Sequence, residues 1–207
     1  MHHEIGCHSF SHQQFGDPGC TEELARAEVA KCVELMKTDY DLVPETFAFP
    51  RDYAGNLSVL KELGFTSFRD TPAKLYPCLR QERTVLNFVK TQMSLAAQFL
   101  SYYLFIPPHV VLPRECLPDL WGIQSCLAYG HKPGIPLWLV TMKAKQGISK
   151  AIRSGKVFTM YTHLKDFGAD SNFLHEFEKV VKFVNHKRRE GKLDVKTMSK
   201  LSRGLTF

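Results

Sequence analysis

Short apolar segments alternate with longer segments of helical periodicity along this chain, and this alternation limits the fold more than any other feature. Segments short enough for strands lie at 46–49, 66–68, 137–140 and 157–162. Segments with apolar residues three and four positions apart lie at 21–37, 57–63, 143–153 and 172–189. Strands that alternate with helices predict an α/β fold with mostly parallel strands.

The remaining predicted elements are less regular. We expect a strand end at 5–9, a long apolar helix at 85–103, a Pro-marked edge strand or loop at 105–112, a short strand at 193–195 and a helical turn from Thr197. In parallel α/β folds, ligands bind at the carboxyl ends of the strands. The polar residues that follow the predicted strands are therefore the first candidates for a site.

The length of 207 residues suits a single domain that spans the whole chain, 1–207. The net charge of +6 comes mostly from the stretch between Lys179 and Lys200. A solvated helix face explains this stretch better than a nucleic-acid site, because no glycine-rich or aromatic nucleic-acid motif accompanies it. We expect no nucleic-acid partner, and a basic binding module stays open as a functional class.

The cysteines and the longest uncharged stretch bear on where the protein works. Six cysteines occur at irregular spacing, which favours reduced thiols over a disulfide framework. Residues 91–113 contain no Asp, Glu, Lys or Arg, but their glutamines and prolines favour a buried helix and an apolar strand over a membrane span. With no secretory signal visible, we expect a cytoplasmic protein.

The first candidate site is the segment His8-Ser9-Phe10-Ser11-His12. Histidines at positions i and i+4 lie on one face of a helical turn, so both rings could reach one cation. Neutral imidazole suits zinc, and also cobalt, nickel or iron. The alternative is a pair of ordinary surface histidines, because two ligands do not complete a zinc site.

Two further segments end predicted strands with polar residues. The strand at 46–49 is followed by Pro50 and Arg51, where a backbone N–H could stabilise an oxyanion. The alternative is an ordinary strand-to-helix loop. The strand at 157–162 delivers His163, which could act as a general acid or base. The alternative is a structural histidine.

Taken in order, these segments resemble the motifs of the polysaccharide deacetylases, carbohydrate esterases that remove N-acetyl groups from sugars. HEIGCHSFSH is similar to their H-[ST]-x-x-H metal motif and its lead-in strand, and FAFPRD with LKELGFTSFR is similar to the next block. GISKAIRSGKVFTMYTHLKDFG resembles the last motif, a strand that ends in histidine, and REGKLDVKTM resembles the closing segment. The resemblance covers nearly the whole chain.

The resemblance implies a role for each matching residue. His8 and His12 would bind a divalent metal, zinc before cobalt, nickel or iron, and His163 would protonate the departing amine. Pro50 and Arg51 would form the oxyanion site, through the backbone N–H near Arg51. The implied substrate is a polysaccharide or glycoconjugate with N-acetyl groups. The implied fold is an incomplete or distorted (β/α) barrel.

The chain also departs from the family pattern. The Thr-Phe-Asp-Asp motif, which supplies the base aspartate and a third metal ligand, has no match, so we expect a chain that is N-terminally truncated relative to the family. Asp119, Trp121 and Trp138 are only candidates for the fourth motif. Three classes therefore stay open: a metal-dependent N-deacetylase with reduced or lost activity, a non-catalytic relative that binds metal or carbohydrate, and a basic binding module.

Overall fold

The structure is a computed structural model that describes residues 3–70, 96–97 and 99–205. The chain forms two compact units. Unit 1 comprises Met1–Thr71, Leu112–Gln124 and Lys196–Phe207, and unit 2 comprises Pro72–Val111 and Ser125–Val195. Each unit is described by itself.

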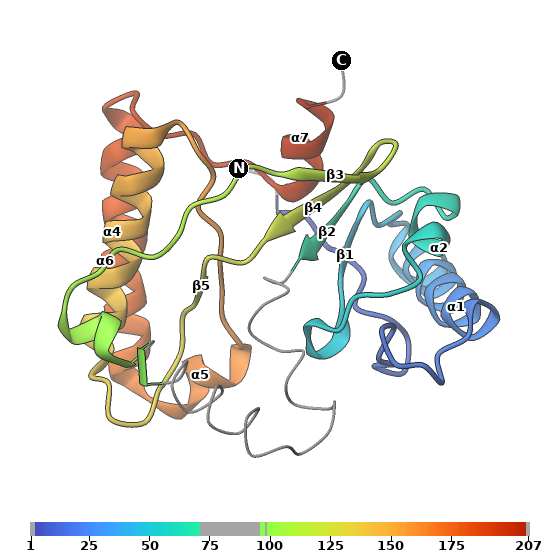
Figure 1. Ribbon diagram of the computed structural model, residues 1–207, viewed down its shortest axis with the longest axis horizontal. Coiled ribbons are helices and arrows are strands. Elements are labelled where there is room, and N and C mark those ends of the chain that lie inside the picture. The colour runs from blue at the N-terminus through green and yellow to red at the C-terminus, as the bar shows by residue number, and fades with distance from the viewer. Residues whose placement is uncertain (1–2, 71–95, 98, 206–207) are drawn as a thin grey trace. The chain divides into compact units, whose positions relative to one another are not determined.

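A four-stranded sheet forms the centre of unit 1 (Figure 1). Its strand order is β1 (Thr46–Ala48), β2 (Ser67–Asp70), β4 (Leu120–Gln124) and β3 (Arg114–Leu117). The first three strands are parallel, and only β3 is antiparallel, to β4. Cys7 extends the parallel arrangement, because it forms a parallel bridge with Phe47 of β1. Segments that follow Cys7, β1, β2 and β4 therefore leave the same edge of the sheet.

Two helices of unit 1 pack against the sheet through an aromatic core. Helix α1 (Glu22–Tyr40) begins at Thr21, whose hydroxyl accepts a hydrogen bond from the Leu24 N–H. Helix α2 (Leu57–Glu62) follows the short 3-10 helix η1 (Pro50–Asp52). Buried side chains of both helices join the phenylalanines of the sheet and its loops in one cluster, which includes Ala25, Val29, Val59, Leu60, Phe15, Phe47, Phe49, Phe65 and Phe68. Edge-to-face ring contacts orient these phenylalanines.

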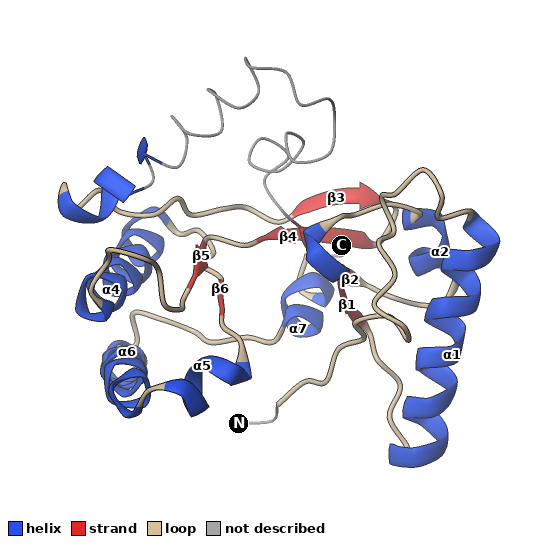
Figure 2. Cartoon of the chain, turned by 90° about the horizontal axis from the view of Figure 1, so that it is seen from below, coloured by secondary structure: helices blue, strands red, loops and turns tan. Residues whose placement is uncertain are grey.

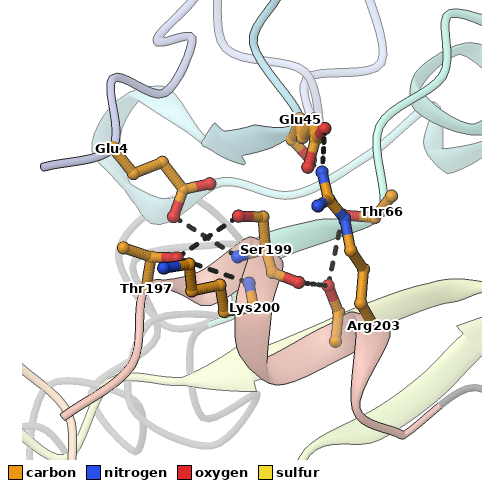
Figure 3. A network of polar contacts seen from close by, with 8 residues as sticks. Glu4, Glu45, Thr66, Thr197, Ser199, Lys200 and Arg203 are labelled. Atoms are coloured by element: carbon orange, nitrogen blue, oxygen red, sulfur yellow. Dashed lines mark hydrogen bonds and ion pairs between the residues drawn. The ribbon is translucent and has the colours of Figure 1, made fainter. Parts of the chain in front are cut away.

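The C-terminal helix α7 (Met198–Arg203) lies against β2 and β4, and polar contacts hold it there (Figure 3). Thr197 caps the helix by accepting a hydrogen bond from the Lys200 N–H at 3.3 Å. The Ser199 N–H donates to Glu4 at 3.3 Å, and the buried Ser202 hydroxyl donates to Thr66 at 3.2 Å. Arg203 pairs with Glu45. These contacts tie the end of the chain to its first residues.

Unit 2 is built on two long helices and a short parallel strand pair. Figures 1 and 2 show α4 (Leu137–Ser154) beside α6 (Ser171–Arg189). Strands β5 (Leu127–Ala128) and β6 (Met160–Tyr161) are parallel, and α5 (Leu164–Ala169) follows β6. Tyr129 and Phe173 are buried at the centre of this unit, and the Tyr129 hydroxyl hydrogen-bonds Thr141 at 2.8 Å.

The prediction of an α/β protein with mostly parallel strands is confirmed. The described residues form no closed barrel. The helices predicted at 21–37, 57–63 and 172–189, and the turn from Thr197, are present, with α1 reaching Tyr40. The single domain over 1–207 stays a prediction.

Several predicted strands are wrong or shorter than expected. Residues 137–140 begin helix α4, because Pro136 starts the helix and Leu137, Val140 and Ala144 continue one buried face at helical spacing. The strand at 157–162 is reduced to β6 with an isolated bridge at Val157, and 193–195 contains no strand. Residues 5–9 and 105–112 contribute only the bridges at Cys7 and Val111. Most of the 85–103 helix lies outside the described residues, although 99–103 are helical.

Candidate functional site

The segment from His8 to His12 is a loop and not the helical turn that the spacing predicted. It leaves the sheet directly after the bridge at Cys7. Ser9 and His12 have left-handed backbone conformations, with φ of 67° and 65°. Because non-glycine residues rarely adopt such angles, the loop needs other contacts to hold its shape.

Glu28 of α1 provides those contacts. One of its carboxylate oxygens accepts hydrogen bonds from the Ser9 hydroxyl at 2.9 Å, the Ser11 N–H at 2.8 Å and the Phe10 N–H at 3.2 Å. The other oxygen accepts a hydrogen bond from the Ser11 hydroxyl at 2.7 Å. Burial by itself would raise the pKa of Glu28, but these hydrogen bonds outweigh it and lower the pKa. A charged Glu28 therefore fixes the histidine loop to the helix.

The two histidine rings lie next to each other. Their centroids are 5.0 Å apart and the rings meet edge to face, with an interplanar angle of 79°. Nδ1 of His8 lies 2.6 Å from the carbonyl oxygen of Ala48 at the end of β1. An N–H at Nδ1 makes this hydrogen bond, which leaves the lone pair of His8 on Nε2. Metal-binding histidines commonly donate their other ring N–H to a carbonyl in this way.

The centroid separation of the pair equals the separation expected of two histidine ligands of one tetrahedral ion. With Zn–N bonds of about 2.0–2.1 Å and a tetrahedral angle, two imidazole centroids would be separated by about 5 Å. Within the described part of the chain, no group of three or more His, Cys, Asp or Glu is placed to hold a metal ion. The pair therefore offers at most half of a four-coordinate shell.

Pro50 and Arg51 leave the same edge of the sheet, in η1 directly after β1 and Phe49. Pro50 is buried and Arg51 is exposed. Arg51 and Asp52 both have positive φ, at 52° and 55°. The first hydrogen-bonded N–H of this turn is that of Asp52, which donates to Phe49 at 3.0 Å, so the turn itself does not use the Arg51 N–H. A donor at a strained strand end is suited to an oxyanion.

A half-buried ion pair supports this turn. Arg69 of β2 lies 2.5 Å from the Asp52 carboxylate. The side chains are 24% and 17% exposed, which keeps the pair partly shielded from water. The Asp52 carboxylate is therefore engaged by Arg69.

His163 belongs to unit 2, whereas His8, His12, Pro50 and Arg51 belong to unit 1. It lies beyond the end of β6, after Thr162, and is the N-terminal flanking residue of α5. Its ring is exposed and lies 6.1 Å, centroid to centroid, from Tyr161. The role that the resemblance implies for His163 stays a prediction.

Unit 2 also has a cavity of about 560 Å³ at the end of α6, lined by Asn185, Arg188, Arg189, Leu193 and Asp194. Asn185, Arg188 and Arg189 share one helix face by their spacing. The carboxylate of Asp194 and the negative C-terminal end of the helix would both repel an anion in this cavity. The cavity alone therefore does not favour the basic binding module.

Sequence reasoning missed two features of this region, the Glu28 anchor and the contact between Cys7 and Cys32. The sulfurs of these cysteines lie 2.8 Å apart, and burial is the main reason why the pKa of Cys7 is raised. The hydroxyls of Ser9 and Ser11 indicated that the loop needs an acceptor, but 17 to 19 positions separate them from Glu28. Only the packing of α1 reveals the partner.

Comparisons with known proteins do not extend this description. No protein-family model matches the chain, and no curated protein matches it. Among the described residues, no helix has the length and apolar character needed to cross a membrane.

Proposed function

We propose that this chain is a divalent-metal-binding, polysaccharide-deacetylase-like protein whose chemistry is hydrolysis of N-acetyl groups on sugars. The observation that carries the proposal is the pairing of His8 with His12, with Nδ1 of His8 bound to the Ala48 carbonyl. This hydrogen bond orients one imidazole for a metal, and the second imidazole lies beside it.

Three features support the same reading. The histidine loop and the Pro50-Arg51 turn leave one edge of a parallel sheet, where α/β proteins bind ligands. Both loops contain left-handed non-glycine residues, which concentrate at functional sites. The order of motifs along the chain is similar to that of the deacetylases.

The roles of the chain's own groups follow from their chemistry. His8 and His12 would hold the metal, and a bound divalent ion would lower the pKa of water and polarise the amide carbonyl. The Arg51 N–H would donate to the oxygen that gains charge during attack. His163 in its protonated form would give its proton to the departing sugar nitrogen.

Cobalt titration of the purified chain, followed by visible absorption, tests the metal site. We expect one weak site in the intact chain and a loss of at least tenfold in affinity in His12→Ala, because one of two protein ligands is removed. The experiment is done in a background with His2→Ala and His3→Ala, since those two histidines could chelate metal by themselves. His175→Ala, an exposed histidine of unit 2, is the matched control.

Acetate release from N-acetylglucosamine oligomers separates the enzyme from a non-catalytic relative. Without the aspartate motif we expect turnover reduced by about 10²–10⁴-fold, the usual contribution of general acid–base catalysis. Metal binding without acetate release, even at high enzyme concentration, favours the non-catalytic relative. Unchanged cobalt affinity in His12→Ala would contradict the metal site and the deacetylase proposal together.

A further inference from the structure

Helix α1 faces the histidine loop along one side, with two side chains spaced one turn apart. Glu28 holds Ser9, Phe10 and Ser11, as described above. Cys32, four residues further along the helix, meets Cys7 immediately before the loop begins. Residues at i and i+4 share a helix face, so the face of α1 that anchors the loop also presents the Cys32 thiol to Cys7. Cys7 forms the base of the loop, because it is the residue immediately before His8.

The two thiols are in contact although 25 positions separate them. Their sulfurs lie 2.8 Å apart, and a disulfide bond is about 2.0 Å long, so a movement of less than about 1 Å would join them. Cys7 is 1% exposed in the core, whereas Cys32 is only partly buried at its edge. Both are free thiols in this structure. An oxidant in solution therefore reaches Cys32 first.

We propose that Cys7 and Cys32 form a reversible disulfide that fastens the base of the histidine loop to α1. The thiolate of Cys32 attacks a low-molecular-weight disulfide such as oxidised glutathione and releases one glutathione thiol, which leaves a mixed disulfide on Cys32. The sulfur of Cys7 then attacks the Cys32 sulfur and releases the second glutathione. Two protein thiols are oxidised, one disulfide is reduced to two thiols, and the two protons end on the released thiols.

The expected effect is a stiffer loop and a more stable unit 1. The bond would close a covalent loop between residues 7 and 32, which restricts the unfolded chain. It would also hold the loop base and the Glu28 contacts at one distance from the helix. Amide hydrogen exchange at Phe10 and Ser11 should slow on oxidation, and the urea midpoint of unfolding should rise.

Peptide mapping of the full chain tests the proposal. The chain is equilibrated at a series of ratios of reduced to oxidised glutathione, its free thiols are blocked, and it is digested with trypsin. We expect residues 32–37 to be recovered linked to the peptide of residues 1–26, with the loss of two hydrogens. Since residues 1–26 also contain Cys20, fragmentation must locate the bond at Cys7.

Three variants sharpen the result. Cys20→Ser should keep the link and the slower exchange, and Cys32→Ser should abolish both while remaining folded by circular dichroism, because Cys32 is only partly buried. Cys116→Ser controls for a partly buried cysteine elsewhere in unit 1. A link to Cys20, or stable glutathione on Cys32 without a link to Cys7, would overturn the proposal. The histidines need not bind metal for the disulfide to form, so metal titration and peptide mapping can fail separately.

Discussion

Glu28 is the residue on which the conformation of the histidine loop depends most. Replacing it with Gln removes the charge that four donors share, and we expect unit 1 to lose about 1–2 kcal/mol of stability, since hydrogen bonds to charged groups are stronger than neutral ones. Urea unfolding at pH 7 measures the loss. Glu34→Gln, on the same helix and in an exposed ion pair with Lys31, should change stability by less than about 0.5 kcal/mol.

The same substitution has a pH signature. The folded-state pKa of Glu28 lies below the ordinary value of 4.5, so its stabilising effect is present above that value and is lost as pH falls through the folded pKa. Glu28→Gln should therefore weaken the decline in stability below pH 4.5. Equal acid sensitivity of Glu28→Gln and the unmodified chain would contradict the anchoring role.

In unit 2, Lys143 of α4 is a buried residue whose charge state is linked to stability. Its amine hydrogen-bonds Ser101 and lies 4.1 Å from the centre of the Tyr102 ring. Burial, with a smaller effect of Lys132, lowers the pKa of Lys143 to about 8 from 10.5. Between these values the unfolded state binds a proton that the folded state does not, so stability should rise with pH.

We expect that rise to amount to about 1–2 kcal/mol between pH 8 and 10 and to be much smaller in Lys143→Met, where Lys132, whose pKa burial also lowers, contributes the remainder. Urea unfolding across this range measures it. Tyr102, whose pKa burial raises to about 12, would reduce stability above its ordinary value of 10, so the series stops there. A variant that keeps the full pH dependence would show that other groups cause it.

At the scale of elements, the turn after the histidine loop includes a close approach of backbone to backbone at Gly55. A Cβ on Gly55 would lie 2.2 Å from the Phe15 carbonyl oxygen, and the neighbouring Gly16 N–H donates to Tyr53 at 3.0 Å. Gly55→Ala should destabilise unit 1 by about 1–3 kcal/mol, as overpacking does. Gly168→Ala in α5, where the added Cβ meets nothing within 4 Å, should be neutral or stabilising in the same thermal unfolding assay. Equal effects would contradict this packing.

The elements also show what the sequence could predict. Helix α1 and helix α6 follow from local signals, namely a capping residue and a periodic apolar face. Residues 137–140 were misassigned because a short apolar run fits a buried strand and a buried helix equally well. The spacing of His8 and His12 predicted adjacent rings through a helical turn that the structure does not contain. The rings are adjacent in a loop whose conformation depends on Glu28 and on the carbonyl of Ala48, which lies 40 positions from His8.

At the scale of the whole molecule, the chain returns to unit 1 after it has formed unit 2, and α7 completes the first unit. The returning helix brings Ser202, 1% exposed, onto Thr66. It also brings Arg203 onto Glu45 (Figure 3). A helix of six residues has little stability by itself, so these tertiary contacts hold it in place. Local sequence signals predicted the helical turn but not the unit to which it belongs.

Deleting residues 196–207 should therefore weaken unit 1 and spare unit 2. We expect a loss of about 2–4 kcal/mol from the buried hydrogen bonds and apolar contacts of α7. The two tryptophans report on the units separately, because Trp121 lies in β4 and Trp138 in α4. In a Trp138→Phe background, fluorescence of Trp121 should show an earlier urea transition after the deletion, whereas amide exchange in α4 should not change.

Ser202→Ala should reproduce about 1–2 kcal/mol of the loss, and Arg203→Ala less than about 1 kcal/mol, since Arg203 is 60% exposed. Equal destabilisation of both units would mean that α7 supports the whole chain and not the sheet of unit 1 alone.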